Sequence, residues 1–284
     1  MIIEIEERKM KTLKKICVLM LCVVMALSAF GCAKSKGKGR SGGSSANAAE
    51  DGTEDFKTEK AGDGYRITGL TETGKTKETV VIPAGYEICG SLSGGVVKHV
   101  TFESDDDAEL ITFFSNSDTL ETCVLPANLS KLCQFTNCSA LQEITIPKNV
   151  TKIPASCFAN CDSLETVEIL GDVTELGNQA FRNCKSLKTI NLPDSIVLVD
   201  HSCFKGCENV SELTLPKNLK TIGSLAFANI GLKTLTVPEE MELEKWDSAA
   251  FIQKEPYTVR VKEGSWADEN FEKVFSGHAV KEYY

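Results

Sequence analysis

Two short stretches carry the residue types of a nucleotide-hydrolysing site. Residues 69–76 read G-L-T-E-T-G-K-T, a full match to the phosphate-binding pattern G-x-x-x-x-G-K-[ST], and residues 196–200 read I-V-L-V-D, an apolar run ending in a possible magnesium ligand. A phosphate loop needs a buried strand before it and a helix after it, because the first amides of that helix hold the phosphates. Residues 77–83, K-E-T-V-V-I-P, are β-branched and end in proline, so they predict a strand. The sequence therefore predicts no nucleotide site.

Cysteine and histidine suggest a second chemistry. C-x-x-x-C spacing occurs at Cys157/Cys161 and Cys203/Cys207, and His201 lies two residues before Cys203, which raises the hypothesis of a zinc or redox site. Against it, these cysteines recur periodically, and alanine takes the place of Cys157 and Cys203 in other units, which is typical of a small buried position. Cys17, Cys22 and Cys32 lie in the amino-terminal segment, and the nine that remain of the 12 cannot all pair. We expect mostly free, buried thiols and no metal or other cofactor.

The acidic run E-S-D-D-D-A-E at residues 103–109 lacks the glycine and the terminal glutamate of a calcium-binding loop. A solvated loop that disturbs the local register is the expected structure. The sequence also contains no evident pairing of a nucleophile with a general base. It therefore predicts that the protein is not an enzyme.

A repeat accounts for the positions of the cysteines and of residues 196–200. The recurring phenylalanines are Phe135, Phe158, Phe181, Phe204 and Phe227, and the recurring cysteines are Cys138, Cys161, Cys184 and Cys207, each set at intervals of 23 residues. A fixed period of this size is the signature of a solenoid. Ile196 and Val199 fall on core positions of their unit, so the supposed magnesium-binding run belongs to the repeat.

Each unit predicts one short strand and a return. The opening L-x-x-I-x-I-P alternates in polarity, so Ile144 and Ile146 are expected to point inward and Glu143 and Thr145 outward. The proline then ends the strand, because it cannot donate to the ladder. A second apolar pair follows, and the unit closes through Phe and Cys in a short turn or helical segment. No unit can bury its own apolar face, so neighbours must stack about 4.8 Å apart.

The pattern resembles the BspA-like bacterial subtype of the leucine-rich repeat. The motifs that carry the resemblance are L-x-x-[IVL]-x-[ILV]-P, V-x-x-I and F-x-x-C-x-x-L. The resemblance implies a mostly β solenoid of about 23-residue units with short helical turns and a parallel sheet on one face. Residues 120–251 are expected to form the repeats, residues 65–119 an N-terminal cap with degenerate repeats, and residues 252–284 a C-terminal cap.

Both caps are predicted in some detail. Residues 65–68 and 77–83 are expected to pair as two strands of a hairpin at the amino-terminal end. A strand and a short helix are expected at the other end, where the aromatic and aliphatic residues Trp266, Phe271, Val274 and Phe275 would cover the open stack.

The parallel sheet of a solenoid is its usual binding surface. The outward positions expected to bind a partner are Thr122, Glu143, Thr145, Thr166, Glu168, Thr189, Asn191, Glu212, Thr214, Thr234 and Thr236, with Val124 beside them. Threonine also simply favours strands, and the set has no Trp, Tyr or Arg of the kind that dominates interfaces. Any affinity for a protein partner is therefore expected to be modest or to depend on the loops.

The amino-terminal end predicts export. Residues 1–31 contain an apolar run that follows three lysines, as in a secretory signal, and the true start is expected at Met10. Cys32 closes the run after the small residues Ala29 and Gly31, which resembles a bacterial lipoprotein signal and implies lipidation of Cys32. Residues 32–64 predict a flexible Gly/Ser/Lys-rich linker, whose basic residues at positions 34–40 would be attracted to anionic lipids.

The formal net charge of −9 argues against a nucleic-acid partner. The sequence thus predicts an exported, lipid-anchored protein whose solenoid binds an extracellular or envelope protein or glycan. The family resemblance implies adhesion to host or neighbouring-cell proteins. Two alternatives remain: a structural module of the cell envelope without a host ligand, and, more remotely, a zinc or redox protein.

Overall fold

The computed structural model describes residues 53–62, 64–88, 92–104, 114–275 and 278–284. The predicted signal segment, Cys32, the basic positions 34–40, Cys89 and most of the acidic run at 103–109 lie outside the described residues. Within the described part of the chain, no helix is both long enough and apolar enough to cross a membrane.

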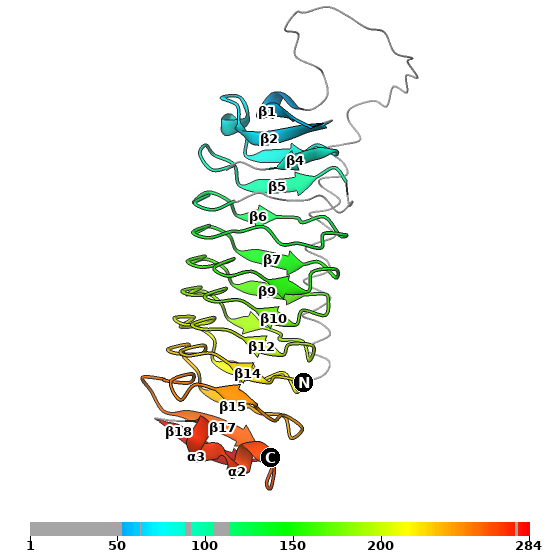
Figure 1. The fold of residues 1–284 in the computed structure, drawn as a ribbon. Coiled ribbons are helices and arrows are strands. Elements are labelled where there is room, and N and C mark those ends of the chain that lie inside the picture. Colours follow the sequence, from blue (N-terminus) through cyan, green and yellow to red (C-terminus); the bar gives the residue numbers. More distant parts are fainter. Residues whose placement is uncertain (1–52, 63, 89–91, 105–113, 276–277) are drawn as a thin grey trace, which may run out of the picture. The chain divides into compact units, whose positions relative to one another are not determined.

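Apart from β1, the described strands are stacked parallel to one another (Figure 1), as the repeat predicts. One side of the stack, here called the front, carries two sheets that are parallel throughout. The first sheet contains β3 (Thr79–Ile82), β5 (His99–Phe102), β6 (Thr122–Cys123), β7 (Glu143–Ile146), β9 (Thr166–Ile169) and β11 (Thr189–Ile190). The second contains β13 (Glu212–Thr214), β15 (Thr234–Thr236), β17 (Tyr257–Val261) and β18 (Ala279–Tyr283).

A further parallel sheet, which the sequence did not predict, follows from the second apolar pair of each unit. Its strands are β8 (Lys152–Ile153), β10 (Glu175–Leu176), β12 (Leu198–Val199), β14 (Thr221–Ile222) and β16 (Lys245–Trp246). In β8, β10, β12 and β14 the second residue is buried and the first is not, because alternate side chains of a strand face opposite sides. The core therefore lies between this sheet and the front sheets.

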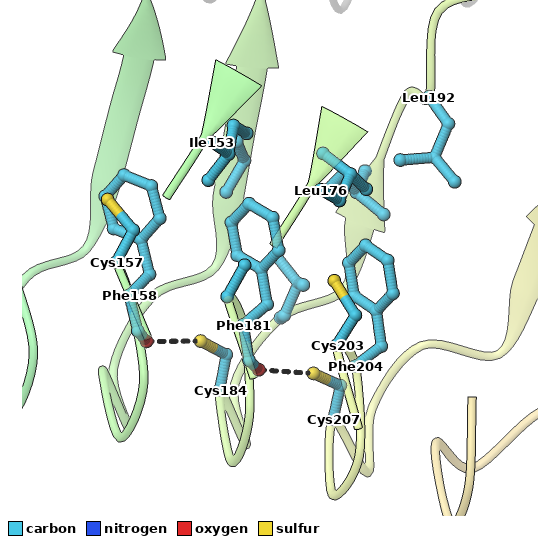
Figure 2. Close-up of a cluster of buried hydrophobic side chains, with 14 of the residues drawn as sticks. Ile153, Cys157, Phe158, Leu176, Phe181, Cys184, Leu192, Cys203, Phe204 and Cys207 are labelled. Carbon is cyan, nitrogen blue, oxygen red and sulfur yellow. Dashed lines mark hydrogen bonds between the residues drawn. The ribbon is translucent and has the colours of Figure 1, made fainter. Parts of the chain in front are cut away.

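A stack of phenylalanine rings runs through that core (Figure 2). Successive rings from Phe114 to Phe251 lie 5.0 to 5.5 Å apart between centroids and within 11° of parallel. All are at most 2% exposed. Offset stacking at this separation is attractive and also buries large apolar surfaces, so the ring of each unit packs on the ring of the unit before it.

The closing segment of each unit is a turn and not a helix, because one or two of its residues adopt left-handed φ angles. Asn137, Asn160 and Asn183 occupy one of these positions, with φ between 60° and 62°. Asparagine tolerates this region better than most residues. Each Asn amide also donates to the amide oxygen of the Asn one unit earlier, at 2.8 to 2.9 Å. The turn conformation and the stacking thus select the same residue.

The amino-terminal cap differs from the prediction. Its elements are η1 (Thr53–Asp55), β1 (Phe56–Ala61), β2 (Gly64–Leu70), η2 (Gly74–Thr76) and β4 (Tyr86–Ile88). The hairpin predicted between residues 65–68 and 77–83 is wrong: β2 pairs antiparallel with β1 and parallel with β4, whereas β3 joins the front sheet through β5. The flexible linker predicted for residues 32–64 is wrong from Thr53 onward, because η1 and β1 lie there. This segment has little apolar content of its own, but Phe56 is buried and β1 pairs along its whole length with β2.

The strand and the helical segment predicted after the last repeat are present, and one further strand follows them. After β17 come two single-turn helices, α2 (Trp266–Glu269) and α3 (Phe271–Val274), and then β18 pairs with β17. Phe271, Val274 and Phe275 are buried, and Phe275 packs on Phe251, the last ring of the stack, at 5.2 Å. These side chains close the open end of the core.

Replacing Phe181 by alanine should lower the free energy of unfolding by about 3–5 kcal/mol, because it removes a buried ring from the middle of the stack. Leu170→Ala, at a side chain that is 57% exposed, should change it by less than about 0.5 kcal/mol. Urea denaturation followed by circular dichroism gives both values. Equal shifts for the two variants would contradict the stacked core.

Candidate partner-binding face

The outward side chains of the front sheets form a continuous polar lane, here called the front lane. Its members among the predicted residues are Thr122, Glu143, Thr145, Thr166, Glu168, Thr189, Asn191, Glu212, Thr214, Thr234 and Thr236. All are exposed or half-buried, and the residues between them are buried. The period-2 alternation places them there, so the predicted orientation is confirmed, while their role in binding stays a prediction.

Strand register sets which lane residues are neighbours. Glu143 lies beside Thr166, and Thr145 lies beside Glu168, across the parallel pair of β7 and β9. The Thr145 hydroxyl is 3.4 Å from Glu168 Oε2, which is a long hydrogen bond. The lane begins further up the stack than predicted, because the ring of His99 on β5 lies 2.9 Å from the Thr122 hydroxyl.

The lane also continues beyond its predicted end. Thr258 and Arg260 of β17 stand in register with Thr234 and Thr236, and β18 adds Val280 and Glu282 on the same face. The alternation in Y-T-V-R-V at residues 257–261 is a signal that could have identified the β17 pair. Arg260 is the one Arg or Lys of the lane from β5 to β18, and its Nε lies 3.7 Å from Glu282 Oε1.

A shallow hollow of about 320 Å³ lies on this end of the lane. Its lining consists of Glu212, Leu213, Thr214, Thr234, Thr236, Arg260 and Glu282. Its lining comes from the second front sheet alone, which begins at β13. The first front sheet ends at β11, while β12 and β14 remain paired in the other sheet.

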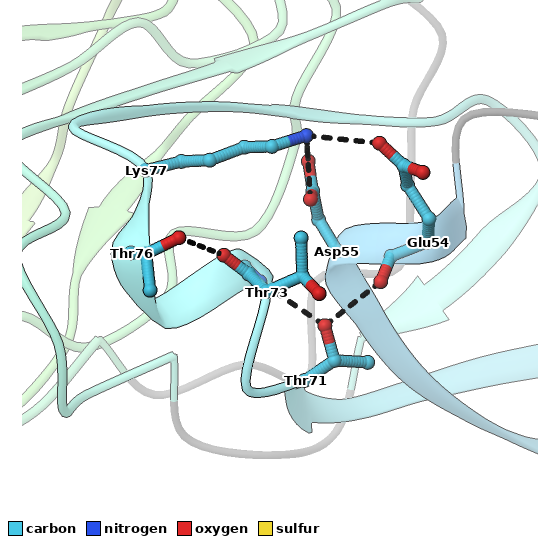
Figure 3. A network of polar contacts seen from close by, with 7 residues as sticks. Glu54, Asp55, Thr71, Thr73, Thr76 and Lys77 are labelled. Atoms are coloured by element: carbon cyan, nitrogen blue, oxygen red, sulfur yellow. Dashed lines mark hydrogen bonds and ion pairs between the residues drawn. The ribbon is translucent and has the colours of Figure 1, made fainter.

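The phosphate-loop pattern does not have the loop and following helix of a phosphate-binding site (Figure 3). Residues 74–76 form the single 3-10 turn η2, and the amides of residues 74 to 77 all donate to Thr71, Thr73 or Gly74. Lys75 pairs with Glu72 at 2.8 Å, and Lys77 pairs with Asp55 and Glu54. The strand predicted after Thr76 is confirmed as β3. The amides and the lysine that would hold phosphate are thus already used within the cap.

The second glycine of this pattern, Gly74, is required by the packing of the cap. A Cβ at Gly74 would collide with the backbone carbonyl of Asp55, so the close approach of the turn to η1 requires glycine. The second apparent motif is equally structural. Ile196 and Val199 are fully buried, and Asp200 Oδ1 accepts a hydrogen bond of 2.7 Å from the amide of His201.

The structure separates the histidine from the cysteines of the supposed zinc site. Cys157, Cys161, Cys203 and Cys207 are fully buried, whereas His201 is half-buried at the surface. Within the described residues, no group of three or more His, Cys, Asp or Glu side chains is placed to hold a metal ion. The spacing of the cysteines therefore comes from the repeat and not from coordination.

The thiols connect one unit to the next (Figure 2). Cys161 donates to the carbonyl of Phe135, Cys184 to that of Phe158, and Cys207 to that of Phe181, at 3.0 to 3.1 Å. Each acceptor lies one unit earlier than the donor. All eight cysteines from Cys123 to Cys207 are free and buried, which confirms the prediction for these eight.

Burial changes the acidity of these thiols. It raises the pKa of Cys133 and that of Cys138 to about 12, because the thiolate would lose its water. Burial also raises the pKa of Cys157 and Cys203. Since the thiolate is the reactive form of cysteine, these side chains are structural.

A second hollow, of about 350 Å³, lies on the opposite sheet and was not predicted. It is lined by Leu198, Asp200, His201, Thr221, Ile222, Gly223, Ser224, Lys245, Trp246 and Asp247. It forms because β14 and its turn carry the small residues Thr221, Gly223 and Ser224 between two units with larger side chains. No periodic signal marks such a difference between units.

Comparison with protein-family models gives one match. The model of the BspA-type leucine-rich repeat region, described as six copies, matches residues 112–188 and 131–257. These overlapping ranges extend over half of the chain and include β6 to β16. No curated protein sequence matches the chain.

Solved structures of bacterial proteins are similar to this chain. A leucine-rich repeat protein from Bacteroides ovatus matches with a TM-score of 0.52 and 22% identity, over 74% of this chain and 64% of its own. A leucine-rich cell surface protein from Faecalibacterium prausnitzii is 22% identical, with a TM-score of 0.40, over 77% of this chain and 49% of its own. A leucine-rich repeat protein from T. pallidum is 19% identical, with a TM-score of 0.47, over 80% and 95%. The chain thus spans about half to two thirds of the length of the first two.

The buried thiols predict a fall in stability at alkaline pH. Their folded-state pKa lies above the ordinary value of 9.0, so the stability that they contribute is present below pH 9 and is lost as the pH rises toward 12. Above pH 9, replacing both Cys133 and Cys138 by alanine should make the fall of the unfolding free energy with pH less steep, by up to about 1.4 kcal/mol per pH unit for each thiol removed. Urea denaturation between pH 7 and pH 10.5 measures the slope. Identical slopes in variant and parent would contradict burial of the neutral thiols.

Proposed function

Because the chain belongs to the BspA-type leucine-rich repeat family, we propose that it is an exported, lipid-anchored protein whose front lane binds a macromolecular partner at the cell surface. The repeat supplies a rigid scaffold of the bacterial surface-protein type. The proposal assigns the binding role to the lane and the anchoring role to Cys32.

The binding role is supported by one observation: folding does not use the outward face of the front sheets. The inward side chains of the front strands are nearly all buried, and the backbones bond to neighbouring strands, so folding does not require the outward side chains. Thr166, Thr189 and Thr214 are exposed on successive units of one lane. A flat row of polar side chains on a rigid support suits an extended polymer, whether protein or glycan.

The anchoring role rests on the sequence. A basic and apolar signal ends at Cys32, and the composition of the following residues indicates a tether between a lipidated cysteine and the repeats. The positive charges at positions 34–40 would add electrostatic attraction to an anionic lipid surface. The family and the surface-protein neighbours support the same location.

One observation favours a second candidate, a structural module of the cell envelope. The lane lacks Trp and Tyr and has Arg260 as its single arginine, although these residues dominate tight protein interfaces. A lane of this composition suits many weak contacts with an ordered envelope polymer. Both candidate functions, adhesion to a host or neighbouring cell and scaffolding within the envelope, would use the same lane. They differ in the partner that the lane binds.

Replacing Cys32 by alanine should move the protein from the membrane fraction of the producing cells to the soluble exported fraction, because the lipid is removed. Substitution of Cys133, which is buried in the repeats, provides the control and should leave the protein with the membrane. Cell fractionation and immunoblotting give the distribution, and protease treatment of whole cells tests surface exposure. Unchanged membrane retention of the Cys32→Ala variant would contradict anchoring by Cys32.

Replacing Thr189 by tyrosine should weaken partner binding at least about tenfold, because a bulky neutral side chain would hold a flat partner away from the lane. Thr151→Tyr is the matched control, since Thr151 is also exposed but lies outside the lane. Immobilised protein is tested for retention of extracellular-matrix proteins and of envelope fractions. Retention of matrix proteins supports adhesion, and retention of envelope material alone supports the scaffold. Equal retention by both variants would contradict the lane as the binding face.

A further inference from the structure

The hollow of about 350 Å³ lies on the sheet from β8 to β16, here called the back sheet. Its floor is β14 with the turn that follows, where Thr221, Gly223 and Ser224 have short side chains or none. A Cβ at Gly223 would collide with the backbone of Asp200 and His201, so the close packing of the two units requires glycine. The packing of the repeat therefore holds the floor of the hollow open.

The walls of the hollow belong to the units on either side of β14. Strand register places Leu198 of β12 on one side of Thr221 and Lys245 of β16 on the other. Asp200 and Asp247 follow the same two strands and line the hollow from its two sides. Because β12 and β16 are two ladder steps apart, about 10 Å, the two aspartates stand on opposite sides of the floor.

One oxygen of each aspartate is held by the backbone. Asp200 Oδ1 accepts a hydrogen bond of 2.7 Å from the amide of His201, and Asp247 Oδ1 accepts one of 2.8 Å from the amide of Ala249. The second oxygen of each carboxylate has no hydrogen-bond partner among the residues that the structure describes. A carboxylate fixed through one oxygen and free at the other is a preorganised acceptor, because a ligand that binds to it immobilises little further side chain.

The other polar side chains of the hollow complement these acceptors. Four of them form no hydrogen bond or ion pair within the described part of the chain: His201, Thr221, Ser224 and Lys245. Lysine and histidine supply donors, and each hydroxyl group both donates and accepts. The aliphatic side chain of Leu198 adds an apolar contact at the edge of the same hollow.

We propose that the hollow on the back sheet binds one pyranose ring of a carbohydrate. A sugar ring presents hydroxyl groups around its rim and C–H groups on its faces, so it requires acceptors, donors and an apolar contact together. Asp200 and Asp247 provide the acceptors, His201 and Lys245 the donors, and Leu198 the apolar contact. The volume lies near the lower end of the range for small-ligand sites, which suits a single ring. This inference goes beyond the binding role of the front lane and does not rest on it.

The separation of the two aspartates favours a ring over a metal ion. Two carboxylate oxygens that share one cation lie within about 5 Å of each other, since each is about 2.0–2.6 Å from the ion. A pyranose ring with a hydrogen bond of about 2.8 Å at either end reaches roughly 11 Å, which matches the distance between β12 and β16. An ionic ligand would depend on Lys245 and Asp247, whose exposed charges attract an ion only weakly.

The probes are N-acetylglucosamine and the methyl pyranosides of glucose, galactose and mannose, each titrated into the full-length protein. Trp246 lines the hollow and lies against Trp266, and these are the two tryptophans of the chain, so intrinsic fluorescence reports on the site. We expect at least one pyranoside to change the emission with a Kd of about 1–10 mM, as for a small ligand held by a few hydrogen bonds. Sorbitol has the hydroxyl groups without the ring and should bind at least about tenfold more weakly, because its flexible chain must be ordered.

The first variant tests the walls of the hollow. Asp200→Asn combined with Asp247→Asn keeps the shape of both side chains but replaces charged acceptors by neutral ones, whose hydrogen bonds are about half as strong. The Kd for the bound pyranoside should rise at least about fivefold. Asp118→Asn combined with Asp172→Asn removes the same charge from exposed positions outside the hollow and should change the Kd less than about twofold.

The second variant tests the floor. Thr221→Phe fills the open space between the two walls and should abolish the fluorescence change. Lys152→Phe is its matched control, because Lys152 is the first residue of β8 as Thr221 is of β14, and it should leave pyranoside binding unchanged. Urea denaturation of each variant verifies that it is folded.

Three results would overturn the inference: no response to any of the four sugars, equal weakening by the two pairs of aspartate variants, and a stronger response to glycine than to every pyranoside. The last would indicate an amino-acid ligand. Thr189→Tyr, which blocks the front lane, should leave pyranoside binding unchanged. Failure of the lane and failure of the hollow are therefore separate results.

Discussion

The stacking of one buried phenylalanine on the next, from Phe114 to Phe251, sets the register on which the rest of the structure depends. A ring can pack on the ring of the preceding unit only if each turn of the chain returns to nearly the same place. That constraint fixes the length of the units, and it brings the Cys161 thiol to the carbonyl of Phe135 and the Asn160 amide to that of Asn137. Ring stacking, thiol donation and the asparagine ladder are therefore one packing arrangement seen at three positions of the unit.

The same packing arrangement leaves the outward side chains of the front sheets without a role in folding. Because the core and the turns satisfy the folding requirements, the outward residues of β7, β9, β11 and β13 are free to vary with function. Neither the core nor the turns need these outward side chains, which is why the lane is the part of this protein to examine for binding.

Local patterns acquire their meaning from the structure around them. The G-L-T-E-T-G-K-T stretch has the residues of a phosphate loop, yet its amides close a 3-10 turn and Gly74 is needed for an approach to Asp55. The cysteines with C-x-x-x-C spacing have the residues of a metal site, yet they are fully buried in the core, whereas His201 is half-buried at the surface. In both cases the element that carries the motif, a cap or a repeat, decides against the chemistry that the spacing suggests.

The sequence alone determined the repeat, its period, the inward phenylalanines and cysteines, and the outward lane from Thr122 to Thr236, because all of these follow from alternation and recurrence along one chain. It did not determine that β1 would pair with β2, that a further sheet would run from β8 to β16, or that the front would break between β11 and β13. Those features depend on backbone partners far apart in the chain and on side-chain sizes in neighbouring units. Only the folded stack brings these partners together, so only the tertiary structure decided where the front is continuous and where it is hollow.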